Sequence, residues 1–166
     1  MYKKSDKKQI NIDECAAKKL SRKEMSVKEL RDYLTKRDYE KEEVDRVIKE
    51  MIDFGYLNDA RFACEFLIYD LEKGKSRKRA FYDLKQKGVS DKDIEAGYNE
   101  YLDEYGEPDE HASAYKEALK VLHAADLEPG EVPEEIREKI SGRIARRLFT
   151  RGFSQSLIYE ILNEIR

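Results

Sequence analysis

The feature that most constrains the fold is an internal repeat, in which one pattern of apolar and turn residues occurs three times. The copies cover residues 26–51, 76–101 and 140–165, at offsets of 50 and then 64 residues. Each copy predicts a helix, a tight turn and a second helix, because apolar residues recur at helical spacing on both sides of the turn. The aligned positions are Leu34, Leu84 and Leu148 before the turn, Asp38, Gly88 and Gly152 within it, and Val44, Ile94 and Ile158 after it.

A third helical run precedes each copy, so the predicted unit has three helices. These preceding helices are expected over residues 12–24, 58–73 and 109–124. No segment alternates apolar and polar residues at strand spacing, which predicts an all-α fold. Units of this size bury too little surface to be stable alone, so we expect three tandem helix-turn-helix-like repeats stacked into an elongated, curved array.

The predicted organisation has four parts. They are a flexible, basic N-terminal tail over residues 1–9 and three-helix repeats over 10–57, 58–106 and 107–166. The extra residues of the third repeat form an acidic loop near 124–135, and Pro133 is expected to start the helix that follows it.

Local signals mark the predicted helix ends. Ser26 and Glu29 match a capping box, in which each side chain satisfies a free backbone N–H group of the other residue. Five glycines follow apolar-periodic runs, where a helix commonly ends in a left-handed residue; they are Gly55, Gly74, Gly88, Gly106 and Gly152. Asp38 replaces glycine in the first turn, and aspartate adopts the left-handed conformation more readily than most residues.

The charge of the chain is strongly segregated. The net charge is −3, yet residues 73–87 carry +6, residues 139–151 carry +5 with no acidic residue, and residues 91–138 carry −12. A partner responds to local charge, because salt screens exposed charges beyond about 8 Å at physiological ionic strength. Two basic blocks that flank an acidic block are therefore the strongest binding signal.

Helical spacing gathers the basic residues of each block on one arc. The candidate partner-binding residues are Lys75, Lys78, Arg79, Tyr82, Lys85 and Lys87 in the second repeat, with Arg143, Arg146, Arg147 and Arg151 in the third. Arginine binds carboxylate and phosphate equally well, so the partner is either an acidic protein surface or nucleic acid. The alternative interpretation is an ordinary solvated helix face.

Few residues suggest catalysis or cofactor binding. His111 and His123 do not form a zinc pattern, and isolated glycines do not form a phosphate-binding loop. Cys15 and Cys64 are expected to be buried, reduced thiols. We therefore expect a cytoplasmic, non-enzymatic protein with no catalytic residues, no cofactor, no metal and no membrane contact. The aromatic residues expected in the core are Phe62, Phe66, Phe81, Phe149 and Phe153.

The segment DFGYLNDARFACEFL (53–67) resembles the most characteristic stretch of the RecX regulatory proteins, G-Y-L-[DN]-[DE]-x-R-F-A. The matching residues, to which the resemblance gives a structural role, are Gly55, Tyr56, Leu57, Asn58, Asp59, Arg61, Phe62 and Ala63. Residues 20–39, 84–90 and 148–154 resemble further family elements in the same order.

The resemblance implies three tandem three-helix repeats, in agreement with the periodicity. It also implies a non-enzymatic modulator of the RecA recombinase, most often an inhibitor, and we expect this chain to be a monomer. Such proteins bind the RecA filament on DNA and reduce filament growth, ATP hydrolysis, strand exchange and the co-protease activity of the SOS response, and hence affect DNA recombination and repair. Some also bind single- or double-stranded DNA, which we expect to be weak for this acidic chain.

Three other functions stay open. A direct DNA-binding protein ranks second, because three-helix units resemble helix-turn-helix modules. A structural adaptor for another filament or protein ranks third, and an enzyme ranks fourth.

Overall fold

The computed structural model describes residues 10–166, and the predicted tail over residues 1–9 lies outside them. Within the described residues the chain forms nine helices and no strand, which confirms the all-α class. The helices are α1 (Ile12–Leu20), α2 (Val27–Thr35), α3 (Lys41–Asp53), α4 (Asp59–Glu72), α5 (Arg77–Gln86), α6 (Asp91–Tyr105), α7 (Glu110–His123), α8 (Glu134–Thr150) and α9 (Gln155–Glu164). None of these helices is long and apolar enough to cross a membrane.

Polar side chains begin most of the helices. Ser26, Ser76, Ser90 and Ser154 each accept a hydrogen bond from the backbone N–H group three residues later, at the starts of α2, α5, α6 and α9. Such bonds satisfy helix N–H groups that have no partner within the helix. At Ser26 the bond from Glu29 is reciprocal, so the predicted capping box is confirmed.

The aligned turns have the predicted left-handed conformation. The φ angle is +60° at Asp38, +80° at Gly88 and +86° at Gly152. The remaining predicted glycines, Gly55, Gly74 and Gly106, also have positive φ. The turn therefore repeats in the backbone as it does in the sequence.

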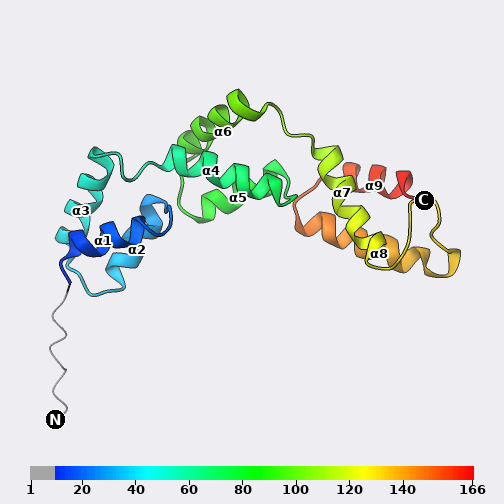
Figure 1. The fold of residues 1–166 in the computed structure, drawn as a ribbon, viewed down its shortest axis with the longest axis horizontal. Coiled ribbons are helices and arrows are strands. Elements are labelled where there is room, and N and C mark those ends of the chain that lie inside the picture. Colours follow the sequence, from blue (N-terminus) through cyan, green and yellow to red (C-terminus); the bar gives the residue numbers. More distant parts are fainter. Residues whose placement is uncertain (1–9) are drawn as a thin grey trace, which may run out of the picture.

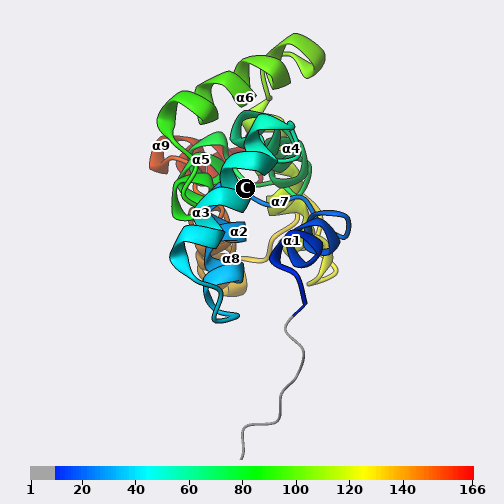
Figure 2. The same ribbon diagram turned by 90° about the vertical axis from the view of Figure 1, so that its left-hand side faces the viewer.

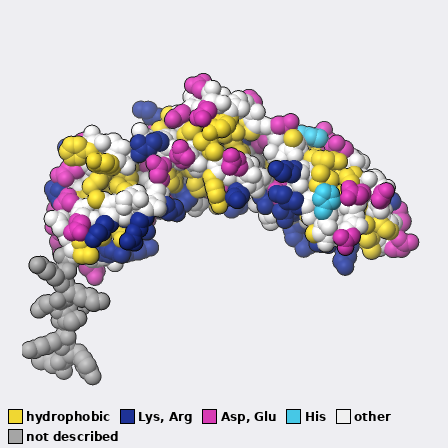
Figure 3. All heavy atoms as spheres, in the orientation of Figure 1, with side chains coloured by type: hydrophobic (Ala, Val, Ile, Leu, Met, Phe, Trp, Pro, Cys, Tyr) yellow, Lys and Arg dark blue, Asp and Glu magenta, His cyan; other side chains and the backbone are white. Residues whose placement is uncertain are grey.

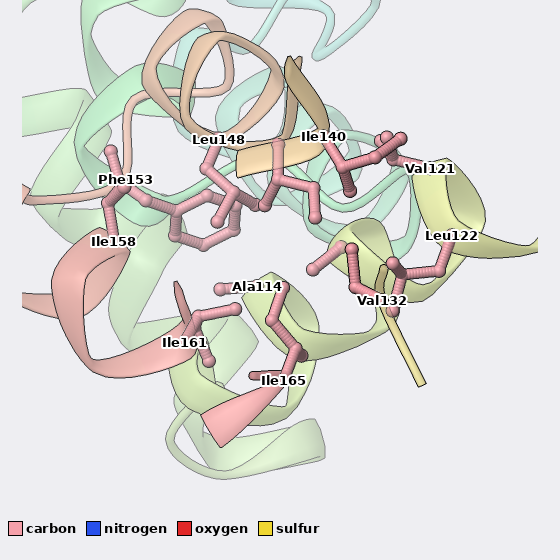
Figure 4. Close-up of a cluster of buried hydrophobic side chains, with 12 residues drawn as sticks. Ala114, Val121, Leu122, Val132, Ile140, Leu148, Phe153, Ile158, Ile161 and Ile165 are labelled. Carbon is pink, nitrogen blue, oxygen red and sulfur yellow. The ribbon is translucent and has the colours of Figure 1, made fainter. Parts of the chain in front are cut away.

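Three separate hydrophobic clusters form the core. We call α1–α3 unit 1, α4–α6 unit 2 and α7–α9 unit 3, because each cluster draws its buried residues from one of these groups and its adjoining loops. Leu34, Leu84 and Leu148 are fully buried, one in each cluster. Figure 4 shows Leu148 beside Phe153 in the unit 3 cluster. The clusters fall within 10–57, 58–106 and 107–166, which stay our proposed division of the chain.

The units follow one another in a shallow arch (Figure 1). Helices α2, α5 and α8 lie toward its lower, concave side, and α6 stands at the top. The view from the unit 1 end again has α6 at the outer edge, opposite α1, α2 and α8 (Figure 2). This shape agrees with the expected curved array.

The junction between units 1 and 2 is held by polar contacts at the start of α2. The Ser26 hydroxyl donates a hydrogen bond of 2.7 Å to the carbonyl of Lys87, in the turn before α6. The Val27 N–H group donates to a carboxylate oxygen of Asp59 at 2.8 Å. The Lys87 ammonium lies 2.5 Å from a carboxylate oxygen of Glu29.

The junction between units 2 and 3 repeats this arrangement at the start of α5. The Ser76 N–H group donates to the carbonyl of Arg151 at 2.9 Å. The Arg77 N–H group donates to a carboxylate oxygen of Glu110 at 2.8 Å. In both junctions, the capping serine of one unit contacts the helix–helix turn of the next.

These junctions explain where the turn requires glycine. A Cβ atom on Gly88 would lie 2.3 Å from the Lys28 side chain, and one on Gly152 would lie 2.6 Å from Cβ of Arg79. In unit 1 the same turn is exposed, and there Asp38 is accommodated. Glycine is therefore needed at positions 88 and 152 for packing as well as for its conformation.

Two sequence expectations need correction. The first helix ends at Leu20 and not near residue 24, since residues 21–23 form a turn before the segment that leads to the α2 cap. Phe149 is 66% exposed, so its predicted core position is wrong. Leu148 faces the core, and the next residue points about 100° away around the helix.

The connection into α8 distinguishes unit 3 from the others. The acidic stretch forms a loop between His123 and Glu134, and Val132 in this loop packs into the unit 3 core. Pro133 is the N-cap, so the helix starts one residue later than expected. Helix α8 therefore begins well before Ile140, the residue that aligns with the capping serines of α2 and α5.

Candidate partner-binding surface

Six of the nine predicted basic residues make ion pairs within the described chain. Glu117 of α7 is only 1% exposed and receives the Arg147 guanidinium at 2.7 Å and the Arg151 guanidinium at 2.9 Å. The Lys120 ammonium is 2.5 Å from the same carboxylate. Burial alone would raise the pKa of Glu117, but hydrogen bonds from Lys120 and Arg147 and the charge of Arg151 outweigh it, so the pKa lies below its ordinary value.

This cluster also ties unit 3 to unit 2. Arg151 donates a hydrogen bond of 2.5 Å to the carbonyl of Lys73, at the end of α4. Gly74 covers the Glu117 carboxylate so closely that a Cβ atom would lie 2.6 Å from its oxygen. Sequence reasoning missed Glu117, although an acidic residue between Ala114 and Ala118 on an apolar stripe was a usable signal.

A second buried cluster lies inside unit 2. The Lys75 ammonium is 2.8 Å from the buried Asp70 carboxylate and 3.0 Å from that of Asp83. Asp83 also accepts a hydrogen bond from Arg79 at 3.1 Å. Burial raises the pKa of Asp83, but the bonds from Lys75 and Arg79 outweigh this effect and lower it.

Lys87 has a similar internal role at the first junction. Its ammonium pairs with Glu29 and lies over the rings of Phe62 and Phe66, at 6.0 and 5.5 Å from their centroids. Lys75, Lys87, Arg147 and Arg151 therefore hold the scaffold together.

The other predicted residues remain available on the surface. Lys78, Arg143 and Arg146 are exposed and make no hydrogen bond or ion pair with another described residue. Tyr82 is exposed, with the Arg79 guanidinium 5.6 Å from its ring centroid. Lys85 pairs with Asp91 at 2.7 Å, but both groups are exposed, and such pairs contribute little.

These available residues lie on α5 and α8. Arg143 and Arg146, together with Arg147 and Thr150, line an open groove of about 360 Å³ between α7 and α8. Figure 3 shows Lys and Arg side chains along the lower margin of the arch, under α5 and α8. The two basic blocks, far apart in sequence, thus contribute to one side of the arch.

Most residues of the G-Y-L segment have structural contacts. Leu57, Phe62 and Ala63 are buried in the cores. The Asn58 side chain caps α4, and Asp59 accepts the hydrogen bond from unit 1 described above. These contacts account for five residues of the segment.

The remaining residues of this segment are exposed. Arg61 donates to the carbonyl of Gly55 at 3.3 Å and pairs with Glu24 at 3.3 Å. Tyr56 is 65% exposed and lines an open groove of about 530 Å³. Packing therefore does not account for Tyr56, whose structural role stays a prediction.

The residues considered for metals and thiol chemistry lie apart. No group of three His, Cys, Asp or Glu side chains among residues 10–166 could hold a metal ion. His111 contacts Glu164 at 3.1 Å in the α7–α9 pair. Cys15 and Cys64 are buried free thiols, as expected.

Two family models match the chain in consecutive units. The first three-helix domain of RecX matches residues 14–51, and the second matches residues 58–97. "Regulatory protein RecX" of Lactobacillus delbrueckii subsp. bulgaricus is 38% identical over 90 residues, which is 54% of this chain and 33% of the relative. The protein of the same name from Listeria welshimeri is 29% identical over 104 residues, 62% of this chain and 37% of the relative. The matched part thus spans about a third of these curated relatives.

Solved structures have the same fold. The crystal structure of RecX from Lactobacillus salivarius superimposes with a TM-score of 0.68 at 22% identity, covering 93% of this chain and 94% of the other. A crystal structure of regulatory protein RecX gives a TM-score of 0.70 at 22% identity, covering 94% and 73%. The relatives are named as regulatory proteins, which is consistent with a non-enzymatic role. With both RecX three-helix domains in order and the same helical array, the chain belongs to the RecX family.

Proposed function

We propose that this protein binds the filament that the RecA recombinase forms on DNA and inhibits it. The observation that carries the proposal is the match of two consecutive units to the RecX three-helix domains. Inhibition would reduce filament growth, ATP hydrolysis, strand exchange and co-protease activity, and hence recombination, DNA repair and the SOS response. A RecA partner would place the protein, as a monomer, in the cytoplasm.

The arch supports binding along a filament. Its junctions are fixed by hydrogen bonds and ion pairs, so contacts on different units would act through one scaffold and their free energies would add. The available side chains on α5 and α8 would meet acidic groups of the filament. Long-range attraction by such a basic face would also speed association.

The decisive experiment is RecA-catalysed, single-strand-DNA-dependent ATP hydrolysis, with this protein titrated well below the RecA concentration. Inhibition at substoichiometric ratios supports filament binding. An unchanged hydrolysis rate at stoichiometric ratios, with the protein folded, contradicts the proposal.

A pair of variants tests the basic face. Arg143→Ala combined with Arg146→Ala should weaken inhibition and leave the thermal melt unchanged, because neither side chain has a partner within the described chain. Lys41→Ala combined with Lys49→Ala removes two exposed charges from α3 and is the matched control. Equal inhibition by both double variants would remove this face from the proposal.

Direct DNA binding is the second candidate, and the groove lined by Arg143, Arg146 and Arg147 favours it. Arginine would take DNA phosphates as readily as protein carboxylates. The test is binding of labelled DNA without RecA. Tight binding that falls steeply with salt would favour this candidate over the first.

A further inference from the structure

Helix α8 contains a glycine that the fold does not require. Gly142 lies in the interior of α8, where glycine weakens a helix relative to alanine. A Cβ atom built on Gly142 would meet no heavy atom within 4 Å. Packing among the described residues therefore gives no reason for glycine at this position.

The chain itself shows what an interior helix glycine can do. Gly97 of α6 lies against α4, where a Cβ atom would be 2.5 Å from the carbonyl oxygen of Ala60 and 2.7 Å from Cβ of Ala63. Glycine thus lets the backbones of two helices approach closely. Gly142 offers the same approach on α8, but no helix of the described chain covers it.

Gly142 lines an apolar groove. The groove lies between α8 and α9, is open along its length and has a volume of about 540 Å³. Ala145, Ile158 and Leu162 contribute further apolar lining. Phe149 and Tyr159, which are 66% and 68% exposed, also line it. Small residues beside two exposed aromatic rings have the form of a site for a helix.

The charge beside the groove indicates which kind of partner helix would bind there. Residues 139–150 of α8 carry four basic residues and no acidic one, and three of these, Lys139, Arg143 and Arg146, are not paired with Glu117. Arg146 lines the groove and has no partner within the described chain. Arg143, one turn before it, lines the neighbouring groove between α7 and α8. The only carboxylate among the lining residues within the described chain is Glu138. A partner helix with apolar side chains facing the groove and carboxylates along its α8 edge would therefore be complementary to this surface.

We propose that the groove between α8 and α9 binds an acidic amphipathic helix of a partner protein. The backbone of that helix would approach Gly142 as α4 approaches Gly97, and a carboxylate on it would meet Arg146. This inference rests on the proposed function for the identity of the partner, RecA, and supplies the surface that would hold it.

The test measures binding of the folded protein to RecA filaments on single-stranded DNA. Gly142→Leu should fill the groove and weaken binding by about tenfold or more, while the melting temperature stays the same or rises. Ala96→Leu adds bulk at an exposed position of α6 and should bind like wild type. Phe149→Ser removes an exposed ring and should weaken binding without loss of stability.

The outcomes separate the two proposals. If wild type binds and Gly142→Leu binds equally well, the groove proposal is overturned and the proposed function stands. If wild type does not bind RecA filaments, both are overturned. If sedimentation shows a wild-type dimer that Gly142→Leu converts to a monomer, the occupant is a second copy, which also overturns the proposal of a partner helix.

Discussion

Replacement of Glu117 by glutamine should loosen the junction between units 2 and 3. The substitution keeps the size of the side chain and removes its charge. Arg147, Arg151 and Lys120 then lose their shared carboxylate. Because Arg151 also bonds to the carbonyl of Lys73, the change reaches the end of α4.

The magnitude follows from the burial of the groups. Removal of one partner of a buried ion pair costs about 3–5 kcal/mol. The side chains of Arg151, Arg147 and Lys120 are 25%, 35% and 48% exposed, so they can turn toward water and recover part of this free energy. We therefore expect a loss of about 3 kcal/mol, at the lower end of that range.

The assay is urea unfolding, followed by the helical circular dichroism signal at several pH values. The pKa of Glu117 is lowered in the folded protein, so its ionised form stabilises the fold above the ordinary pKa, and this contribution is lost as the pH falls through the folded pKa. Wild type should therefore lose more stability than Glu117→Gln between about pH 5 and pH 3.

The control is Glu95→Gln, which removes an exposed carboxylate from α6. It should unfold like wild type at every pH. A loss below about 1 kcal/mol for Glu117→Gln, the range of an exposed pair, would refute the reasoning. Parallel pH profiles for wild type and Glu117→Gln would refute it as well.

Two further predictions concern the core and the turns. Leu148→Ala should cost about 2–5 kcal/mol, because the side chain is fully buried, and a melting midpoint within error of wild type would contradict this. Gly88→Ala should destabilise by more than about 1 kcal/mol, since its Cβ atom would meet Lys28 at a positive φ angle. Asp38→Gly, at the exposed equivalent turn, should be neutral or stabilising. Urea unfolding measures the stability of both turn variants. A Gly88→Ala variant more stable than wild type would contradict the prediction.

The sequence predicted the fold well because the repeat gave one register in three copies. The alignment predicts equivalent positions for Leu34, Leu84 and Leu148, and all three are buried. Phe149 was expected in the core because the aromatic residues follow the apolar spacing, yet it lies one position past the aligned leucine and is 66% exposed. Apolar spacing within one helix is therefore a weaker guide to burial than a register shared by three copies.

The binding surface could be predicted only in part. Helical spacing identifies which basic residues share an arc, but it does not show what a neighbouring helix places opposite them. Arg147 and Arg151 meet Glu117 across unit 3, whereas Arg143 and Arg146 meet no partner in the described chain. The three-dimensional structure is therefore needed to tell which residues of one stripe hold the scaffold together and which are available on the surface.

The two junctions also bear on how such an array could lengthen by duplication of a unit. A copy inserted before unit 1 would place its capping serine against Asp38. The Cβ atom of Asp38 occupies the space that glycine leaves free at positions 88 and 152. A copy added after unit 3 would meet Pro133, and not serine, at the start of α8. Duplication alone would therefore produce ill-fitting neighbours, and growth in either direction would require new residues at the contact.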